Sequence, residues 1–302
     1  MRYERSRARS GRTCLWLLIP VFLLCFGCRA GERNGAVSAP AQAAVSIQNT
    51  GSDTLVNLAL AWAEAYMDSH PEVRLAVTGG GSGTGIAGLL NGTVQIANAS
   101  REMSAEELER ARAGGLHPVR ITVARDAIAV VVNPGNPVGR LTLAQISALY
   151  TGSITRWKEL GGQDRPVVLL SRESNSGTYV YFLENVVRLG RKEDRSLFSP
   201  ETLLMPSSEG ISTEVRQNPN AVGYDGLGYV TPEQKTLAVA RDERGPYVLP
   251  SASTVNDGSY PIARPLFMYT AGEPSGPVKE YLDWITGEGQ ALVKGLGFVP
   301  LR

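Results

Sequence analysis

Two Ser-Gly-Thr tripeptides, each at a point where a predicted strand gives way to a predicted helix, most constrain what this chain can fold into. The first occupies residues 82–84 after the strand-like stretch 73–78, and the second occupies 176–178 after 167–170. The first N–H groups of a helix lack partners, and small hydroxylated residues let an anion approach them closely. The tripeptides therefore indicate two turns that could bind one oxyanion. The alternative is that both are ordinary helix N-caps.

Strand-like and helix-like stretches alternate from residue 45 to the end of the chain. The predicted strands are 45–48, 73–78, 95–99, 119–123, 127–132, 167–170, 221–224 and the extended stretch 261–269. The predicted helices are 55–67, 86–90, 141–150, 179–189, 208–217, 278–285 and 288–294, with one more opened by a capping box at 104–107 and closed by glycines at 114 and 115. This alternation predicts an α/β fold with mostly parallel sheets covered by helices. The length of 302 residues is sufficient for two lobes with a ligand at the carboxyl ends of the strands.

Composition excludes several classes of function. Charged residues make up 20% of the chain and the formal net charge is +1, so no broad basic surface for nucleic acid is expected. His70 and His117 each precede a proline, and neither has a metal-ligating neighbour in the sequence. The sequence therefore predicts no nucleic-acid partner, no metal site and no cofactor.

Enzyme motifs are weak or missing. Residues 83–88 formally match Gly-x-Gly-x-x-Gly, but the match falls at the second strand–helix junction and lacks an acidic residue at a following strand end. No Gly-x-Ser-x-Gly turn occurs, and a serine nucleophile would have only two loop histidines as candidate bases. We therefore expect a binding protein without catalytic residues.

The N-terminus reads as a targeting segment. Five arginines precede the apolar run 15–26, which is too short to span a bilayer comfortably. The following Gly27-Cys28 resembles the lipobox of bacterial lipoproteins, so residues 1–28 are expected to be a signal peptide and Cys28 to be lipidated. Residues 29–44 are then a flexible tether. The alternative is a secretory signal cleaved near 39–44. No cysteine follows Cys28, so no disulfide is expected in the fold.

Arg172 is the expected counter-charge for an anion. Its planar guanidinium suits tetrahedral oxyanions, and it lies four residues before Ser176, so one loop can bring both to one ligand. The alternative is an ion pair between Arg172 and Glu173 or an aspartate.

Six sequence blocks together resemble the phosphate-binding proteins of bacterial phosphate ABC transporters. The four more specific blocks are Gly-Ser-Asp-Thr at 51–54, the glycine-rich run 79–86, Ile-Ala-Asn-Ala-Ser-Arg at 96–101, and 172–178. Two less specific blocks, 149–157 and 289–301, agree with them. The resemblance covers the chain from 45 to 302.

The resemblance implies a two-lobed type II periplasmic binding protein fold. Two crossover strands near 127–132 and 261–269 would join the lobes. The first lobe would comprise 45–128 and 262–302, and the second lobe 129–261.

The resemblance also implies which residues hold phosphate. Asp53, Thr54 and Ser82 would bind it from the first lobe. Arg172, Ser176, Gly177 and Thr178 would bind it from the second.

The chain departs from the family at two positions that are expected to meet. Many members have threonine where this chain has Asp53, and aspartate where it has Arg101. Asp53 is therefore expected to accept the proton of hydrogen phosphate, while Arg101 pairs with Asp53 or supplies a second positive charge. The alternative is that Asp53 caps a helix, with its charge balanced by Arg101 and selectivity set elsewhere, for example by Glu173.

The function implied is that of a lipid-anchored, monomeric receptor in the periplasm or on the outer face of a bacterial membrane. It would bind inorganic phosphate and deliver it to the transmembrane subunits of an ABC permease. The alternatives are a receptor for another tetrahedral oxyanion, a phosphate sensor on the same fold, and a phosphatase-like enzyme with a serine nucleophile.

Overall fold

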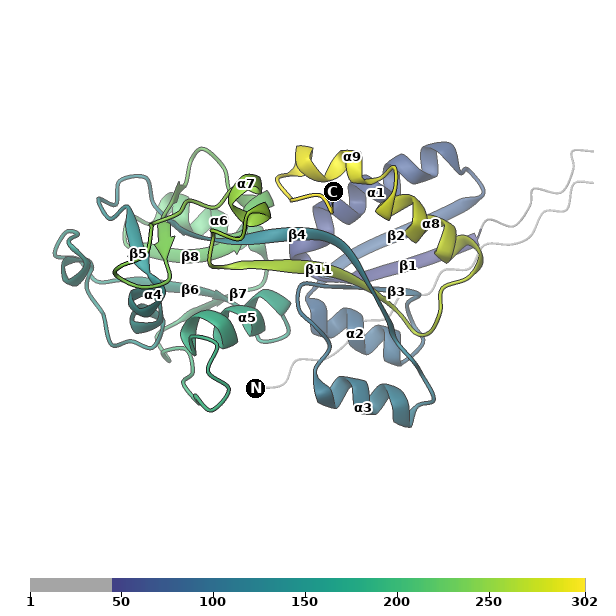
Figure 1. The fold of residues 1–302 in the computed structure, drawn as a ribbon, viewed down its shortest axis with the longest axis horizontal. Helices are drawn as coiled ribbons and strands as arrows, with labels where there is room; N and C mark the ends of the chain where they lie inside the picture. Colours follow the sequence, from purple (N-terminus) through teal and green to yellow (C-terminus); the bar gives the residue numbers. More distant parts are fainter. Residues whose placement is uncertain (1–44, 302) are drawn as a thin grey trace, which may run out of the picture. The chain divides into compact units, whose positions relative to one another are not determined.

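The computed structural model describes residues 45–301, which are built around one mixed sheet (Figure 1). Within this part of the chain, nine strands pair in the order β2-β1-β3-β11-β4-β8-β6-β7, with β9 added to β4, and β10 pairs with β5 separately. The strands are β1 Val45–Gly51, β2 Val73–Gly80, β3 Ile96–Ala99, β4 Val119–Val132, β5 Arg140–Thr142, β6 Val168–Arg172, β7 Leu203–Met205, β8 Ala221–Gly226, β9 Lys235–Thr236, β10 Ala238–Ala240 and β11 Ala263–Thr270.

Helices cover both faces of this sheet. They are η1 Asp53–Leu55, α1 Val56–Ser69, α2 Ser82–Leu90, α3 Ala105–Ala113, α4 Leu143–Tyr150, η2 Trp157–Leu160, α5 Gly177–Phe182, η3 Leu183–Val187, α6 Ser208–Gln217, η4 Leu227–Tyr229, α7 Ala252–Asn256, α8 Gly276–Thr286, α9 Gln290–Val293 and η5 Lys294–Leu296. The predicted capping box of α3 is confirmed, because the Ser104 side chain accepts from the Glu107 N–H and the Glu107 side chain accepts from the Ser104 N–H.

The first lobe consists of β1–β3, α1–α3, α8 and α9. Its strands β2, β1 and β3 are parallel, and helices α1, α8 and α9 lie on one side of them while α2 and α3 lie on the other (Figure 1). Side chains alternate between the two faces along a strand. Ile96 of β3 therefore packs with Trp62 and Tyr281 in one core, while Ala97 packs with Ile86 in the other.

The second lobe consists of β5–β10 and α4–α7. Strands β7, β6 and β8 run parallel, and β8 pairs antiparallel with β4. Tyr150 and Phe182 pack on one face of this sheet, whereas Ile211 and Val215 of α6 pack on the other. Both lobes thus place strand carboxyl ends and helix starts at a common edge, as the alternating pattern predicts.

Strands β4 and β11 pass from one lobe to the other. The first half of β4 pairs with β11 and its second half, Ile128–Val132, pairs with β8. The sequence prediction of two separate strands at 119–123 and 127–132 is wrong, because β4 continues through the charged residues Arg125 and Asp126. Asp126 remains buried inside the strand because Arg264 of β11 pairs with it.

The predicted two-lobed α/β fold with two crossover strands is confirmed. The exact lobe limits, 45–128 with 262–302 and 129–261, stay predictions. The signal peptide, Cys28 and the tether lie outside the described residues. Among the helices that are described, none combines the length and the apolar character needed to cross a membrane.

Candidate anion-binding site

The first turn of the site follows β1 and carries Asp53 and Thr54. Gly51 ends the strand with a φ of 143°, and a Cβ there would lie 2.2 Å from the carbonyl oxygen of Asn98. The N–H of Ser52 donates to the same carbonyl over 2.8 Å. This close approach to β3, which only glycine permits, directs the start of η1 out of the sheet edge.

The first Ser-Gly-Thr tripeptide follows β2. Gly81, with a φ of 94°, occupies the N-cap of α2, so the helix begins at Ser82. The buried Ser82 hydroxyl accepts from the N–H of Ser100 over 3.0 Å and lies 3.3 Å from the Ser100 hydroxyl. Ser82 therefore ties the start of α2 to the loop after β3, and Ser100 joins the candidate site.

The second Ser-Gly-Thr tripeptide follows β6 and starts α5. Ser176 is the N-cap, and its hydroxyl oxygen accepts from the N–H of Thr178 over 3.2 Å and of Tyr179 over 3.4 Å. The Ser176 hydroxyl proton takes no part in these two bonds, so it can be donated to an anion.

The two lobes meet at these turns. The hydroxyl oxygens of Thr54 and Thr178 lie 2.8 Å apart. A Cβ on Gly177 would lie 2.3 Å from the Ser82 hydroxyl oxygen and 2.6 Å from that of Ser100. Four predicted residues, Thr54, Ser82, Gly177 and Thr178, are therefore brought together from opposite lobes.

A second contact between the lobes lies beside this one and is made by Asn175. Its carbonyl accepts from the Gly83 N–H over 2.9 Å, and its side chain donates to the Gly80 carbonyl over 2.8 Å. The glycine-rich run after β2 therefore packs directly against the loop that precedes α5.

Arg172 is buried between Asp53 and the start of α6. Its Nη1 lies 3.2 Å from Oδ2 of Asp53 and 3.0 Å from the hydroxyl of Ser208, and its Nη2 donates to the Pro206 carbonyl over 3.0 Å. The alternative of an ion pair with an aspartate is thus present in the structure. An incoming anion would share this guanidinium with Asp53.

The structure contradicts two alternatives for Asp53. It does not pair with Arg101, and it does not cap its own helix, since its Oδ2 instead accepts from the N–H of Ser208 over 2.8 Å. Ser208 is the first residue of α6, so a first-lobe carboxylate lies at the positive N-terminal end of a second-lobe helix. Asp53 is therefore an acid that links the two lobes.

Arg101 directly follows Ser100, but its terminal nitrogens bind an acid that is not among the predicted site residues. Both of its terminal nitrogens bind the Glu107 carboxylate at 2.7 Å, and Nη1 also donates to the Glu102 carbonyl over 2.8 Å. Arg101 also lowers the pKa of Glu107 against the opposing effect of burial. The expected pairing with Asp53 is wrong, because Glu107 takes both terminal nitrogens. The Nε of Arg101 is buried without a hydrogen-bond partner, and its role as an anion ligand stays a prediction.

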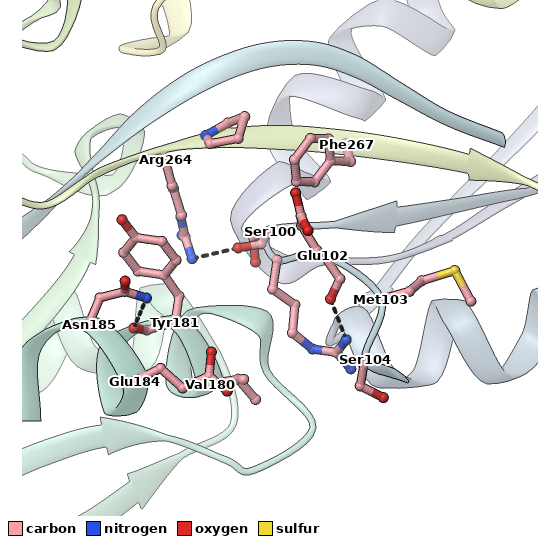
Figure 2. A pocket seen from close by; sticks show the side chains of 12 residues that line it. Ser100, Glu102, Met103, Ser104, Val180, Tyr181, Glu184, Asn185, Arg264 and Phe267 are labelled. Atoms are coloured by element: carbon pink, nitrogen blue, oxygen red, sulfur yellow. Dashed lines mark hydrogen bonds between the residues drawn. The ribbon is translucent and has the colours of Figure 1, made fainter. Parts of the chain in front are cut away.

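A cavity of about 460 Å³ lies between the Arg101 loop and α5 (Figure 2). Ser100 and Arg264 are the members of its lining that also contact the candidate site, while Tyr181 and Phe267 give it aromatic walls. Figure 2 shows the Arg264 guanidinium reaching from β11 toward the backbone of Ser100 beside the Tyr181 ring.

Three buried ionisable residues of the site were missed by the sequence analysis. Arg264 and Asp126 form an ion pair at 3.1 Å on the crossover strands. Burial raises the pKa of Asp126, although Arg264 opposes this. At the end of β8, burial raises the pKa of Asp225 to about 7, with Arg172 among the groups that lower it. A charged residue inside an otherwise apolar strand was the available signal for Asp126 and Arg264.

Comparisons with known proteins agree with this geometry. A profile of the PBP superfamily domain matches residues 36–288. The phosphate-binding protein PstS of Pseudomonas aeruginosa is 32% identical over 274 residues, which span 85% of this chain and 83% of the relative. The chain belongs to the family of phosphate-binding proteins of bacterial phosphate ABC transporters.

Solved structures support membership of this phosphate-binding protein family. A substrate-binding protein of Clostridium perfringens with bound phosphate is 32% identical, with a TM-score of 0.76 over 85% of this chain and 100% of that chain. An ABC-type phosphate transport receptor of Vibrio cholerae is 29% identical, with a TM-score of 0.67 over 84% of this chain and 99% of that chain. The predicted family is confirmed, whereas the roles of the individual site residues stay predictions.

Proposed function

We propose that this protein binds inorganic phosphate between its two lobes and delivers it to an ABC permease. One observation carries the proposal: hydroxyl groups from both lobes converge, with Thr54 and Thr178 2.8 Å apart and Gly177 against Ser82, and the buried Arg172 pairs with Asp53, the neighbour of Thr54 in the sequence. Relatives of similar length that are named for phosphate binding and phosphate transport support it.

The ligand would be held by donors from both lobes and would balance part of the Arg172 charge. The proposed donors are the hydroxyls and first helix N–H groups at Thr54, Ser82, Ser176, Gly177 and Thr178. Closure of the lobes around the anion removes water, which strengthens each of these charge-assisted hydrogen bonds. Arg101 is left out of this proposed set because both of its terminal nitrogens bind Glu107 at 2.7 Å.

Selectivity would come from Asp53. Phosphate near neutral pH keeps at least one proton, which a carboxylate oxygen can accept, whereas sulfate offers only lone pairs and like charge. Oδ2 of Asp53 already accepts from Ser208 and faces Arg172, so Oδ1 is the proposed proton acceptor.

The test is a calorimetric titration of the purified protein with phosphate, sulfate, arsenate and molybdate. The parent should bind phosphate and discriminate against sulfate, and Asp53→Asn should weaken phosphate binding and narrow that preference. Asp257→Asn, at an exposed position outside the site, is the matched control. An unaltered phosphate-to-sulfate ratio in Asp53→Asn would remove Asp53 from the selectivity mechanism, and no phosphate binding in the parent would end the proposal.

The protein is further proposed to act as a binder and not as an enzyme. Its relatives are named as binding or transport proteins. Incubation with a chromogenic phosphate ester should release no dye above the rate in buffer. Turnover that disappears in Ser82→Ala or Ser176→Ala would favour the phosphatase-like alternative instead.

The location outside the cytoplasm and the lipid anchor are proposed from the N-terminal pattern. Lipoproteins carry more than one acyl chain, and two or more chains anchor a protein stably. Cys28→Ser should therefore move the protein from the membrane fraction to the soluble fraction of a cell extract. Identical fractionation of parent and variant would contradict lipidation.

The protein is proposed to act as a monomer that contacts the transmembrane subunits of the permease.

A further inference from the structure

A buried ion pair joins the two crossover strands next to the candidate site. Arg264 of β11 donates to Oδ2 of Asp126 on β4 through Nη2 at 3.1 Å and through Nε at 3.3 Å. The side chains are 1% and 0% exposed. An apolar pair of similar volume would often stabilise a fold as well as a buried ion pair does. The pair is therefore a candidate for a role beyond stability.

Arg264 also contacts both lobes. Its Nη1 donates to the Ser100 carbonyl over 3.0 Å, and its Nη2 donates to the Thr178 hydroxyl over 2.9 Å and approaches that of Thr54 at 3.4 Å. One guanidinium thus reaches a first-lobe loop, a first-lobe threonine and a second-lobe threonine. The planar fork of arginine makes this possible, whereas a lysine ammonium presents a single point of charge.

These contacts determine how the two threonine hydroxyls are oriented. A guanidinium only donates, so both hydroxyl oxygens face it as acceptors. One hydroxyl must donate to the other across their 2.8 Å separation. This uses one of the two hydroxyl protons, and the second proton has to point away from Arg264. The threonine pair therefore has one donor left to offer.

We propose that Arg264, held in place by Asp126, is a positioning residue of the anion site that orients the Thr54–Thr178 hydroxyl pair so that its one remaining proton is donated to the ligand. The inference rests on the proposed function and adds to it a residue that does not itself touch phosphate. Because Asp126 balances its charge, Arg264 acts through the geometry of its hydrogen bonds to the two threonines.

A double-mutant cycle tests the proposal. Phosphate Kd is measured by calorimetry on the full-length parent, Thr178→Val, Arg264→Lys and the combined variant. Losing one oriented hydrogen bond should weaken phosphate binding about tenfold in each single variant. The combined variant should bind about as well as Thr178→Val alone, because Arg264 acts through that hydroxyl.

A purely structural role would give a different result. The two losses would then multiply in the combined variant, and this outcome would overturn the proposal. Arg125→Lys, which changes an arginine of the same strand as Asp126 that bonds to the Pro300 carbonyl, is the matched control and should leave phosphate Kd unchanged. A Kd change in this control equal to that in Arg264→Lys would also overturn it.

Two further measurements keep the test decisive. If Arg264→Lys does not fold, the pair Asp126→Leu with Arg264→Met removes both buried charges together and takes its place in the same cycle. Failure of the parent to bind phosphate would contradict the proposed function and this inference together. Binding by the parent with multiplying losses would contradict this inference alone.

Discussion

The same tripeptide, Ser-Gly-Thr, performs different local tasks in the two lobes. In the second lobe, Ser176 is the N-cap of α5 and accepts from N–H groups of its own helix. In the first lobe, α2 begins one residue earlier relative to the tripeptide, and Ser82 accepts from Ser100 of the next strand's loop.

The residue before each tripeptide explains this difference. Gly81 adopts a φ of 94° and takes the N-cap position, so Ser82 becomes the first helical residue. Its hydroxyl therefore does not cap the helix and instead accepts from the Ser100 N–H. Asn175 precedes the second tripeptide, and Ser176 keeps an extended conformation that suits a cap. A three-residue motif thus marks the strand–helix junction, and the preceding residue determines whether the serine caps its own helix or binds the neighbouring loop.

The largest expected effect concerns charge, which the second lobe supplies through Arg172. Arg172→Ala should weaken phosphate binding by about 2–5 kcal/mol, because it removes a buried charged partner and leaves Asp53 unpaired. Arg101→Ala, at an arginine of the first lobe that pairs with Glu107, should leave the affinity unchanged. Calorimetry of both variants decides the matter, and equal losses would mean that Arg101 shares the site after all.

The next effect compares the central glycines of the two tripeptides. Gly177→Ala would place a Cβ 2.3 Å from the Ser82 hydroxyl oxygen, whereas Gly83→Ala would place one 3.3 Å from the Asn175 carbonyl. Overpacking costs about 1–3 kcal/mol, so Gly177→Ala should bind phosphate about 5- to 150-fold more weakly. Gly83→Ala should change the affinity less. If Gly83→Ala weakened phosphate binding more than Gly177→Ala in a titration, the lobes would not close along the contact between Gly177 and Ser82.

The smallest expected effect concerns Asp225, an acid of the second lobe near Arg172, and the change of Tm with pH. Burial raises the pKa of Asp225 to about 7, so the folded protein holds a proton that the unfolded chain releases near pH 4. The stability that this proton provides is complete below pH 4 and is lost as the pH rises to about 7. Asp225→Asn needs no such proton, so its Tm relative to that of the parent should rise as the pH is raised from about 4 to about 7 and stay constant above that.

Asp257→Asn is the control for the pH experiment. The Ser259 hydroxyl and N–H lower the pKa of this exposed acid, so its replacement should bring no gain at pH 8. Parallel Tm curves for parent and Asp225→Asn over this pH range would show that Asp225 is ionised in the folded protein.

The sequence by itself determined the features that depend on neighbours along the chain. Alternating stretches predicted the α/β fold and the strand–helix turns at Thr54, Ser82 and Ser176, and the Ser-x-x-Glu motif predicted the capping box at Ser104. These patterns act over a few residues. The combined sequence blocks also predicted the family, which the comparisons confirm.

Only the tertiary structure decided which charged groups meet. Asp126 and Arg264 are 138 residues apart, and Asp53 and Ser208 are 155 residues apart, so no local pattern could pair them. Sequence reasoning expected Arg101 to pair with Asp53 or to supply a second positive charge, whereas the fold pairs Asp53 with Arg172 and Arg101 with Glu107. The physical reason is that the partner of a buried charge depends on which strands and helices become neighbours, and this is a property of the whole sheet.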